Sequence, residues 1–206
     1  MDKRQKAWEE RRKYFIGRLE KDVIKGRVDS DILNLLKLIN SLDNFYTLSS
    51  CSGRIQFLEG PSFSKRNNLK SLAKFHFPIS KEDLIKIIEK LDGENVWISV
   101  QSPIIHIACK DLSDAYKMLK IARGIGFKHS GILAINEERY VLELFSSMRI
   151  DFPLKFKGNY LINFENIDSL VEILNGYLVK SKILIKRLEE EIIKYKNSLT
   201  YGTNRN

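Results

Sequence analysis

The chain has 206 residues, of which 43% are hydrophobic and 30% charged, with 11 glycines and 4 prolines. This composition excludes disordered, collagen-like and low-complexity proteins and predicts a folded globular one. The formal net charge of +9 at pH 7 indicates a polyanionic partner such as nucleic acid.

The predicted helices and strands follow one another in an irregular order. Helical spacing of apolar side chains predicts five helices: residues 3–25, 30–40, 80–91, 111–126 and 166–196. Asp29 or Ser30 is expected to cap the second helix, and Ser80 with Asp83 the third. Short apolar or alternating runs predict eight strands: residues 45–48, 54–58, 72–77, 96–100, 104–109, 131–135, 139–145 and 160–164.

This irregular order is typical of an α+β fold, so we expect one domain over residues 1–206 with a mixed or largely antiparallel sheet and flanking helices. A Rossmann fold is not expected, because Gly124 and Gly126 end a helix instead of linking a strand to one. Residues 51–57 and 146–152 share Ser, Arg, Ile and Phe at equivalent positions. This echo indicates an internal duplication with halves at about residues 45–110 and 130–165.

The last predicted helix carries a regular apolar stripe. Eight of nine positions at heptad spacing between Ile167 and Tyr195 are apolar. Such a stripe suits either a long helix packed on another helix or a coiled-coil dimer. The helix over residues 3–25 has a matching stripe, so we expect the two helices to pack together within one chain, which favours a monomer.

The surplus of positive charge lies in three segments: residues 1–30, 54–74 and 180–206 each carry +4. The two remaining stretches sum to −3. We expect these segments to form one basic face. The alternative is that they are the solvated, lysine-rich surfaces of separate helices.

The cysteines and the apolar runs indicate the compartment. The two cysteines, Cys51 and Cys109, cannot form a disulfide framework, and the first 15 residues contain no apolar leader. No apolar run approaches the roughly 20 residues of a membrane span. We therefore expect a cytoplasmic protein without a membrane segment.

The most unusual stretch runs from Ser49 to Arg54, where four small polar side chains and a glycine stand in place of a strand. Its hydroxyls, the Gly53 amide and the Arg54 guanidinium can bind an anion such as a phosphate or a carboxylate. The alternative is a β-bulge or turn whose serines bind their own backbone. Cys51 is less favoured as a nucleophile, because no His or Asp adjoins it in sequence.

Other polar groups are weaker candidates. Ser130 lies in a glycine-bounded turn between a helix and a strand, and Arg149 with Asp151 forms a charged pair for which a surface ion pair is the alternative. His76 and His106 lie in predicted strands, where a histidine is commonly a core or rim residue. Because His106 and Cys109 would point to opposite faces of their strand, no metal site is expected.

Taken together, these segments resemble the family of the third protein of the wybutosine-synthesis pathway. The specific part is the run from Ser49 to Ile55. The same order continues with His76–Pro78, Val96–Trp97 with Ile105–Ile107, Gly126–Ile132 and Arg149–Pro153. The resemblance covers about residues 5 to 190.

The resemblance implies an S-adenosylmethionine-dependent methyltransferase that lacks the Rossmann fingerprint. Its substrate would be N4 of the tricyclic guanosine derivative beside the anticodon of phenylalanine tRNA. The candidate bases for the N4 proton are His76, His106 and Asp151. The residues implied in binding cofactor or substrate are Ser50, Cys51, Ser52, Gly53, Arg54, Ser130, Gly131 and Arg149. The candidates for tRNA phosphate contact are Lys65, Arg66 and Lys70.

Two other classes of function compete with this one. A non-enzymatic RNA-binding module is supported equally by the charge distribution. A coiled-coil scaffold built on the last helix would be a dimer.

Overall fold

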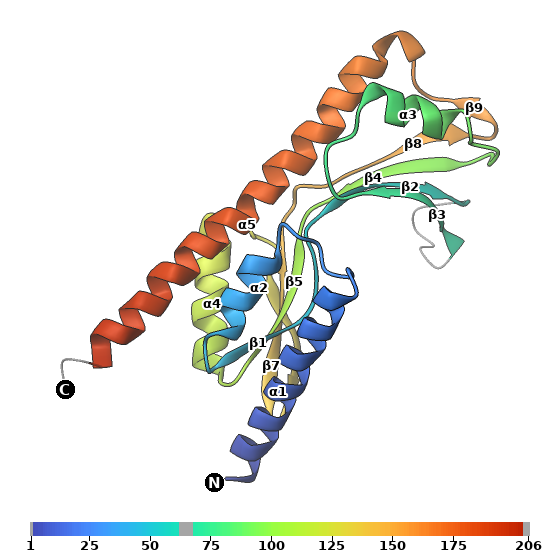
Figure 1. The fold of residues 1–206 in the computed structure, drawn as a ribbon. Coiled ribbons are helices and arrows are strands. Elements are labelled where there is room, and N and C mark those ends of the chain that lie inside the picture. Colours follow the sequence, from blue (N-terminus) through green and yellow to red (C-terminus); the bar gives the residue numbers. More distant parts are fainter. Residues whose placement is uncertain (1, 62–67, 204–206) are drawn as a thin grey trace. The chain divides into compact units, whose positions relative to one another are not determined.

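The computed structural model describes residues 2–61 and 68–203 (Figure 1). The helices there are α1 (Lys3–Ile24), α2 (Leu33–Asn40), α3 (Lys81–Ile88), α4 (Leu112–Ile125) and α5 (Ile167–Thr203). The strands are β1 (Phe45–Cys51), β2 (Arg54–Glu59), β3 (Lys70–Phe75), β4 (Val96–Gln101), β5 (Ile104–Cys109), β6 (Gly131–Asn136), β7 (Arg139–Phe145), β8 (Ile150–Phe156) and β9 (Asn159–Tyr160). None of the described helices combines the length and the hydropathy needed to cross a membrane.

The chain forms two compact units. Unit 1 comprises Met1–Ser52, Pro103–Ser147 and Ile183–Asn206, and unit 2 comprises Gly53–Ser102 and Met148–Lys182. The chain passes between the units four times, so neither unit is one continuous segment. Each unit contains one antiparallel sheet. The predicted α+β class is confirmed, with two sheets instead of one.

Unit 1 contains a four-stranded sheet in the order β1-β5-β7-β6. Neighbouring side chains of β1 point to opposite faces. Tyr46 faces α1, where its ring centroid lies 4.9 Å from that of Trp8. Phe45 faces the C-terminal part of α5, where its ring centroid lies 6.4 Å from that of Tyr195. The expected packing of the last helix on the first is therefore wrong, because α1 and the C-terminal part of α5 pack against opposite faces of this sheet.

Unit 2 contains a five-stranded sheet in the order β3-β2-β4-β8-β9. One face packs on α3 and on the N-terminal part of α5. Ile55, Phe57 and Val100 are fully buried on this face with Leu174 and Leu178 of α5. Burying one such side chain contributes about 1.5–3 kcal/mol, so the first part of the α5 stripe is used inside unit 2.

Strand β8 has no counterpart among the predicted strands, because a proline and a charged pair indicate a strand end. Pro153 lies opposite Trp97 of β4, and the register shifts between Trp97 and Val96. Such an irregularity accommodates a residue that has no N–H to donate. The predicted strand over residues 160–164 is wrong beyond Tyr160, because a 3-10 helix begins at Phe164.

The sequence echo has a structural counterpart in unit 2. Strands β2 and β8 flank β4 in the same register, so that Ile55 and Ile150 both lie opposite Val100. The chain enters unit 2 shortly before each of these strands, at Gly53 and at Met148. Each sheet takes strands from both predicted halves, and the internal duplication stays a prediction.

The predicted helix caps have mixed outcomes. The capping box of α3 is confirmed, with the Ser80 hydroxyl accepting from the Asp83 amide at 3.1 Å. The predicted cap of α2 by Asp29 or Ser30 is wrong, because α2 begins only at Leu33 and has no side-chain cap. The Asp29 carboxylate accepts instead from the backbone of Ser52, at the end of β1.

Candidate active site

Ser49, His106 and Glu143 form a hydrogen-bonded chain across three neighbouring strands of unit 1. The pairing of β1 with β5 shifts by one residue between Thr47 and Ser50, which is a β-bulge. Ser49 Oγ lies 2.6 Å from His106 Nδ1. His106 Nε2 lies 2.9 Å from Oε2 of Glu143, which is directly opposite on β7.

The partners of the His106 ring define its tautomer. An ionised carboxylate accepts hydrogen bonds and cannot donate them. The bond to Glu143 therefore assigns the ring proton of neutral His106 to Nε2, which leaves Nδ1 to accept from the Ser49 hydroxyl. The His106 side chain is 23% exposed and that of Glu143 39%. This chain can accept a proton from a group at the serine and hold the imidazolium next to a negative charge.

Ser130 and Gly131 lie at the start of β6, in unit 1. The buried Ser130 hydroxyl donates to the Phe127 carbonyl at 2.7 Å and accepts from the Phe145 amide at 3.0 Å. Gly131 is paired with Glu143, and a Cβ at this glycine would meet no atom within 4 Å. Ser130 thus fixes the turn onto β7. Gly131 leaves open space at the position opposite Glu143.

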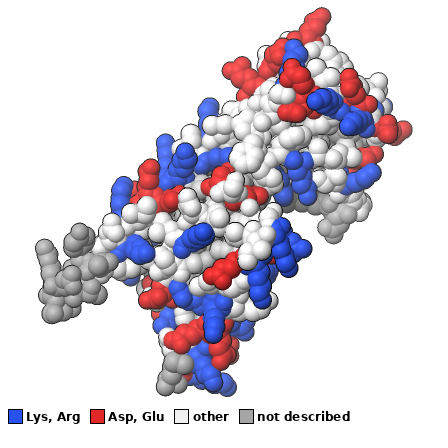
Figure 2. Space-filling view, viewed as in Figure 1, with Lys and Arg blue, Asp and Glu red and all other residues white. Residues whose placement is uncertain are grey.

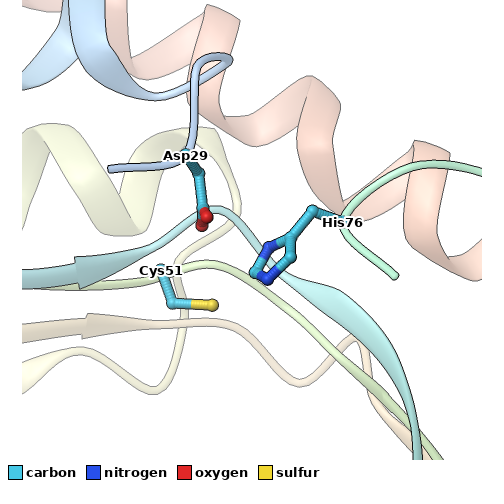
Figure 3. A group of neighbouring side chains, drawn as sticks. All are labelled: Asp29, Cys51 and His76. Atoms are coloured by element: carbon cyan, nitrogen blue, oxygen red, sulfur yellow. The ribbon is translucent and has the colours of Figure 1, made fainter. Parts of the chain in front are cut away.

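The residues that follow Ser49 at the end of β1 lie next to Asp29. The Asp29 carboxylate accepts from the Ser52 amide at 2.8 Å, and one of its oxygens lies within 4.8 Å of Cys51 Sγ (Figure 3). The buried Ser50 Oγ has no hydrogen-bond partner among the described residues. Among the described residues, the Ser50 hydroxyl is thus left without a partner, whereas the Ser52 amide already donates to the Asp29 carboxylate.

Gly53 and Arg54 belong to unit 2, where Arg54 joins a polar network on three strands. Arg54 Nε donates to Gln101 at 3.2 Å, and the Gln101 amide donates to Ser99 Oγ at 3.3 Å. The Ser99 hydroxyl donates to Asp151 at 2.5 Å, and the other Asp151 oxygen forms an ion pair with Arg149. The Asp151 carboxylate thus already has two partners within the unit.

The other predicted site residues belong to unit 2 or lie outside the described residues. His76 directly follows β3 in unit 2 and is half-buried. Lys70 is exposed at the start of β3, opposite Glu59. Lys65 and Arg66 lie outside the described residues. The structure thus brings Ser50, Cys51 and Ser52 into the same unit as His106, Ser130 and Gly131, and it assigns the other described candidates to unit 2.

The basic residues of α1 are partly neutralised within unit 1. Figure 2 shows Lys and Arg side chains over this helix interspersed with acidic ones. Arg4 pairs with Asp111 at 3.1 Å, and Arg11 pairs with Glu138. Convergence of the three basic segments on one face stays a prediction.

Sequence reasoning missed Ser49 and Glu143 as members of the site. Ser49 was part of the noted motif, but the bulge that turns it toward His106 depends on pairing with β5. Glu143 is a lone acidic residue between Leu142 and Leu144. That alternation was the one available signal that its carboxylate faces the same side of the sheet as His106.

Comparison with known proteins identifies the family. The model of the family described as Methyltransferase TYW3 matches residues 5–194. The chain belongs to this methyltransferase family. The resemblance seen in the sequence is thereby confirmed.

Similar proteins of known name share one activity in those names. A protein of Pyrococcus furiosus is 41% identical over 174 residues, covering 84% of this chain and 89% of that relative. One of Saccharolobus solfataricus is 34% identical and covers 96% of each chain. Both are named as tRNA(Phe) 7-((3-amino-3-carboxypropyl)-4-demethylwyosine(37)-N(4))-methyltransferases, the former with the suffix 1.

Solved structures show the same fold. A Pyrococcus horikoshii protein, 38% identical, superposes with a TM-score of 0.85 and covers 89% of this chain and 95% of its own. An Aeropyrum pernix protein, 32% identical, gives a TM-score of 0.72 and covers 80% of this chain and 96% of its own. The absence of a Rossmann fold, expected from the sequence, agrees with these neighbours.

Proposed function

We propose that this protein transfers a methyl group from S-adenosylmethionine to N4 of a 4-demethylwyosine-type guanosine at position 37 of tRNA(Phe). The reaction is supported by the names of relatives at 34–41% identity over most of the chain. A tRNA substrate is consistent with a cytoplasmic protein. The observation that carries the mechanism is the Ser49–His106–Glu143 chain.

The residues of this chain handle the proton that leaves N4. Ser49 Oγ accepts the N4 proton while its own proton moves to His106 Nδ1. One proton thus leaves the nucleobase, and one arrives at the imidazole. Glu143 then holds the imidazolium through Nε2–H. General-base catalysis of this kind contributes about 10²–10⁴-fold to a rate. Of the three candidate bases, His106 has the partners best suited to the task.

S-adenosylmethionine, when bound, supplies a methyl group carried on a positively charged sulfur. The buried Ser50 Oγ fits this donor, because it is a hydroxyl without a partner among the described residues and lies one residue from Ser49. Where the methionyl part of this donor lies beside β1, Ser50 would donate to its carboxylate. The neighbouring Asp29 carboxylate supplies negative charge next to the same segment.

We propose that Lys65, Arg66 and Lys70 contact tRNA phosphates. Each phosphate contact contributes about −0.7 to −0.9 to the slope of log K against log salt concentration. The double variant Lys65→Ala, Arg66→Ala should therefore bind tRNA(Phe) more weakly and with a shallower salt slope. An unchanged affinity and slope would contradict this assignment.

The reaction is tested with methyl-labelled S-adenosylmethionine and tRNA(Phe) that carries the N4-demethylated nucleoside. We expect label in the tRNA with the wild type and a 10²–10⁴-fold slower transfer with His106→Ala. Lys120→Ala is the control, because Lys120 is an exposed residue on α4 of the same unit. Tight binding of the tRNA without any transfer or cofactor binding would favour an RNA-binding module instead.

A further inference from the structure

A cavity of about 180 Å³ lies in unit 1 between α1, the loop after it and the end of β1. We propose that this cavity binds a 3-amino-3-carboxypropyl group, that is, an α-amino acid head group on a short apolar chain. The inference rests on the proposed function, because both substrates of that reaction carry this group. Three features of the cavity support it: its charges, its size and a buried hydroxyl.

The charges of the cavity complement those of an α-amino acid. Asp22 lies between two arginines, with its oxygens 3.7 Å from Arg18 Nε and 3.9 Å from Arg27 Nη1. At these distances each guanidinium group attracts the Asp22 carboxylate but is too far from it for a good hydrogen bond. The arginines can therefore donate to a ligand carboxylate, and the Asp22 carboxylate can accept from a ligand ammonium.

The size of the cavity selects a head group and not a whole nucleoside. Pockets for drug-sized ligands measure about 300–1,000 Å³, whereas this one is well below that range. Phe15, Leu19 and Leu48 supply its apolar wall. This wall suits the methylene groups that link an amino acid head group to the rest of its molecule.

Two serines of β1 connect the cavity with the proton acceptor. Both Ser49 and Ser50 line it. Ser50 Oγ is buried with no partner among the described residues, which costs free energy unless a ligand binds it. Ser49 Oγ is the atom that contacts His106 Nδ1. A head group in this cavity would therefore be anchored beside the catalytic chain.

The group can come from either of two molecules. In S-adenosylmethionine it is the methionyl part, bonded to sulfur. In the nucleoside named for the relatives it is the side chain at position 7. The chemistry of recognition is the same, so the experiment must separate the two sources.

The first arm measures ligand binding by calorimetry. S-adenosylhomocysteine carries the head group, and 5′-methylthioadenosine lacks it. If the cavity holds the head group of the methyl donor, Arg27→Ala and Ser50→Ala should lower the affinity for S-adenosylhomocysteine about 10-fold to 100-fold. The affinity for 5′-methylthioadenosine should stay unchanged. Lys120→Ala is the control, because it removes one exposed positive charge from α4 of the same unit without touching the cavity.

The second arm measures the affinity for tRNA(Phe) with and without the 3-amino-3-carboxypropyl side chain. If the cavity holds the side chain of the tRNA nucleoside, the same variants should lower only the affinity for the tRNA that bears this side chain, by a similar factor. The inference is overturned if the variants bind every ligand as the wild type does in both arms, or if they lower the affinities for ligands with and without the group equally. Failure of the proposed function is distinguishable, because the wild type itself would then neither bind S-adenosylhomocysteine nor transfer a methyl group.

Discussion

His106 and Glu143 lie directly opposite each other on β5 and β7, with 2.9 Å between Nε2 and a carboxylate oxygen. A Glu143→Gln variant keeps the shape of this pair and removes its charge. An amide nitrogen facing Nε2 would also favour the other ring tautomer, in which Nδ1 carries the proton and cannot accept one. We expect transfer to slow by up to about 10²–10⁴-fold, with the affinity for S-adenosylhomocysteine unchanged. Single-turnover kinetics measure the first and calorimetry the second.

The matched control for this prediction is Glu137→Gln, which changes an exposed glutamate in the turn between β6 and β7. If both variants transfer methyl groups at the wild-type rate, Glu143 has no part in the proton transfer.

Asp151 and Arg149 should differ in what they contribute to stability. The ion pair between them lies near the surface, so Arg149→Ala should cost no more than about 1 kcal/mol. Asp151→Ala removes the acceptor of the fully buried Ser99 hydroxyl, which should cost about 1–3 kcal/mol. Urea unfolding of the two variants gives both values. Equal losses would show that the Ser99 bond contributes nothing beyond the ion pair.

Asp114 should make the protein less stable as the pH rises. Burial raises the pKa of this carboxyl above its usual 3.8, although a hydrogen bond from Asn44 opposes the shift. The folded state then holds the proton more tightly than the unfolded state does. The contribution of this group is fully present below about pH 3.8 and is lost as the pH rises through the raised pKa.

An Asp114→Asn variant should therefore gain stability relative to the wild type between about pH 4 and pH 7. Thermal unfolding across this range measures the difference. A difference in melting temperature that does not change with pH would refute the raised pKa of Asp114.

The two cysteines should react at different rates. Cys109 is fully buried on β5, and desolvation together with the Asp114 charge raises the pKa of its thiol. The thiolate is the reactive form, so iodoacetamide should modify the half-buried Cys51 first. Mass spectrometry of the native protein reports the order, and Cys109→Ser should leave the initial rate unchanged. Faster labelling of Cys109 would mean that β5 opens more readily than its burial implies.

Local signals made much of the fold predictable. The helix over residues 3–25 and the capping box at Ser80 with Asp83 depend on side chains only a few positions apart, and both are found. The hairpin of β6 and β7 likewise follows from two alternating runs around a polar turn. Such features do not require knowledge of distant partners.

The errors concern contacts between distant segments. Pro153 ends a strand by its local chemistry, but the irregular pairing of β8 with β4 accommodates it. The apolar stripe of α5 matched that of α1, yet α1 and the C-terminal part of α5 pack on opposite faces of the sheet in unit 1. The bulge at Ser49 required the register of β5, which no local pattern contains. For this reason the sequence pointed to His106 without its two partners.

The bulge in β1 also affects whether the four-stranded sheet of unit 1 can pair with a strand of another molecule. β1 is an outer strand of this sheet, and β6, the other outer strand, has a register shift of its own between Ile132 and Ala134. A strand from another molecule needs an even row of free N–H and C=O groups to extend a sheet. Irregular edge strands interrupt that row. This matters on β6, where the apolar side chains of Leu133 and Ile135 are 57% and 66% exposed. The distortion that turns Ser49 toward His106 is thus also a feature that disfavours edge-to-edge pairing.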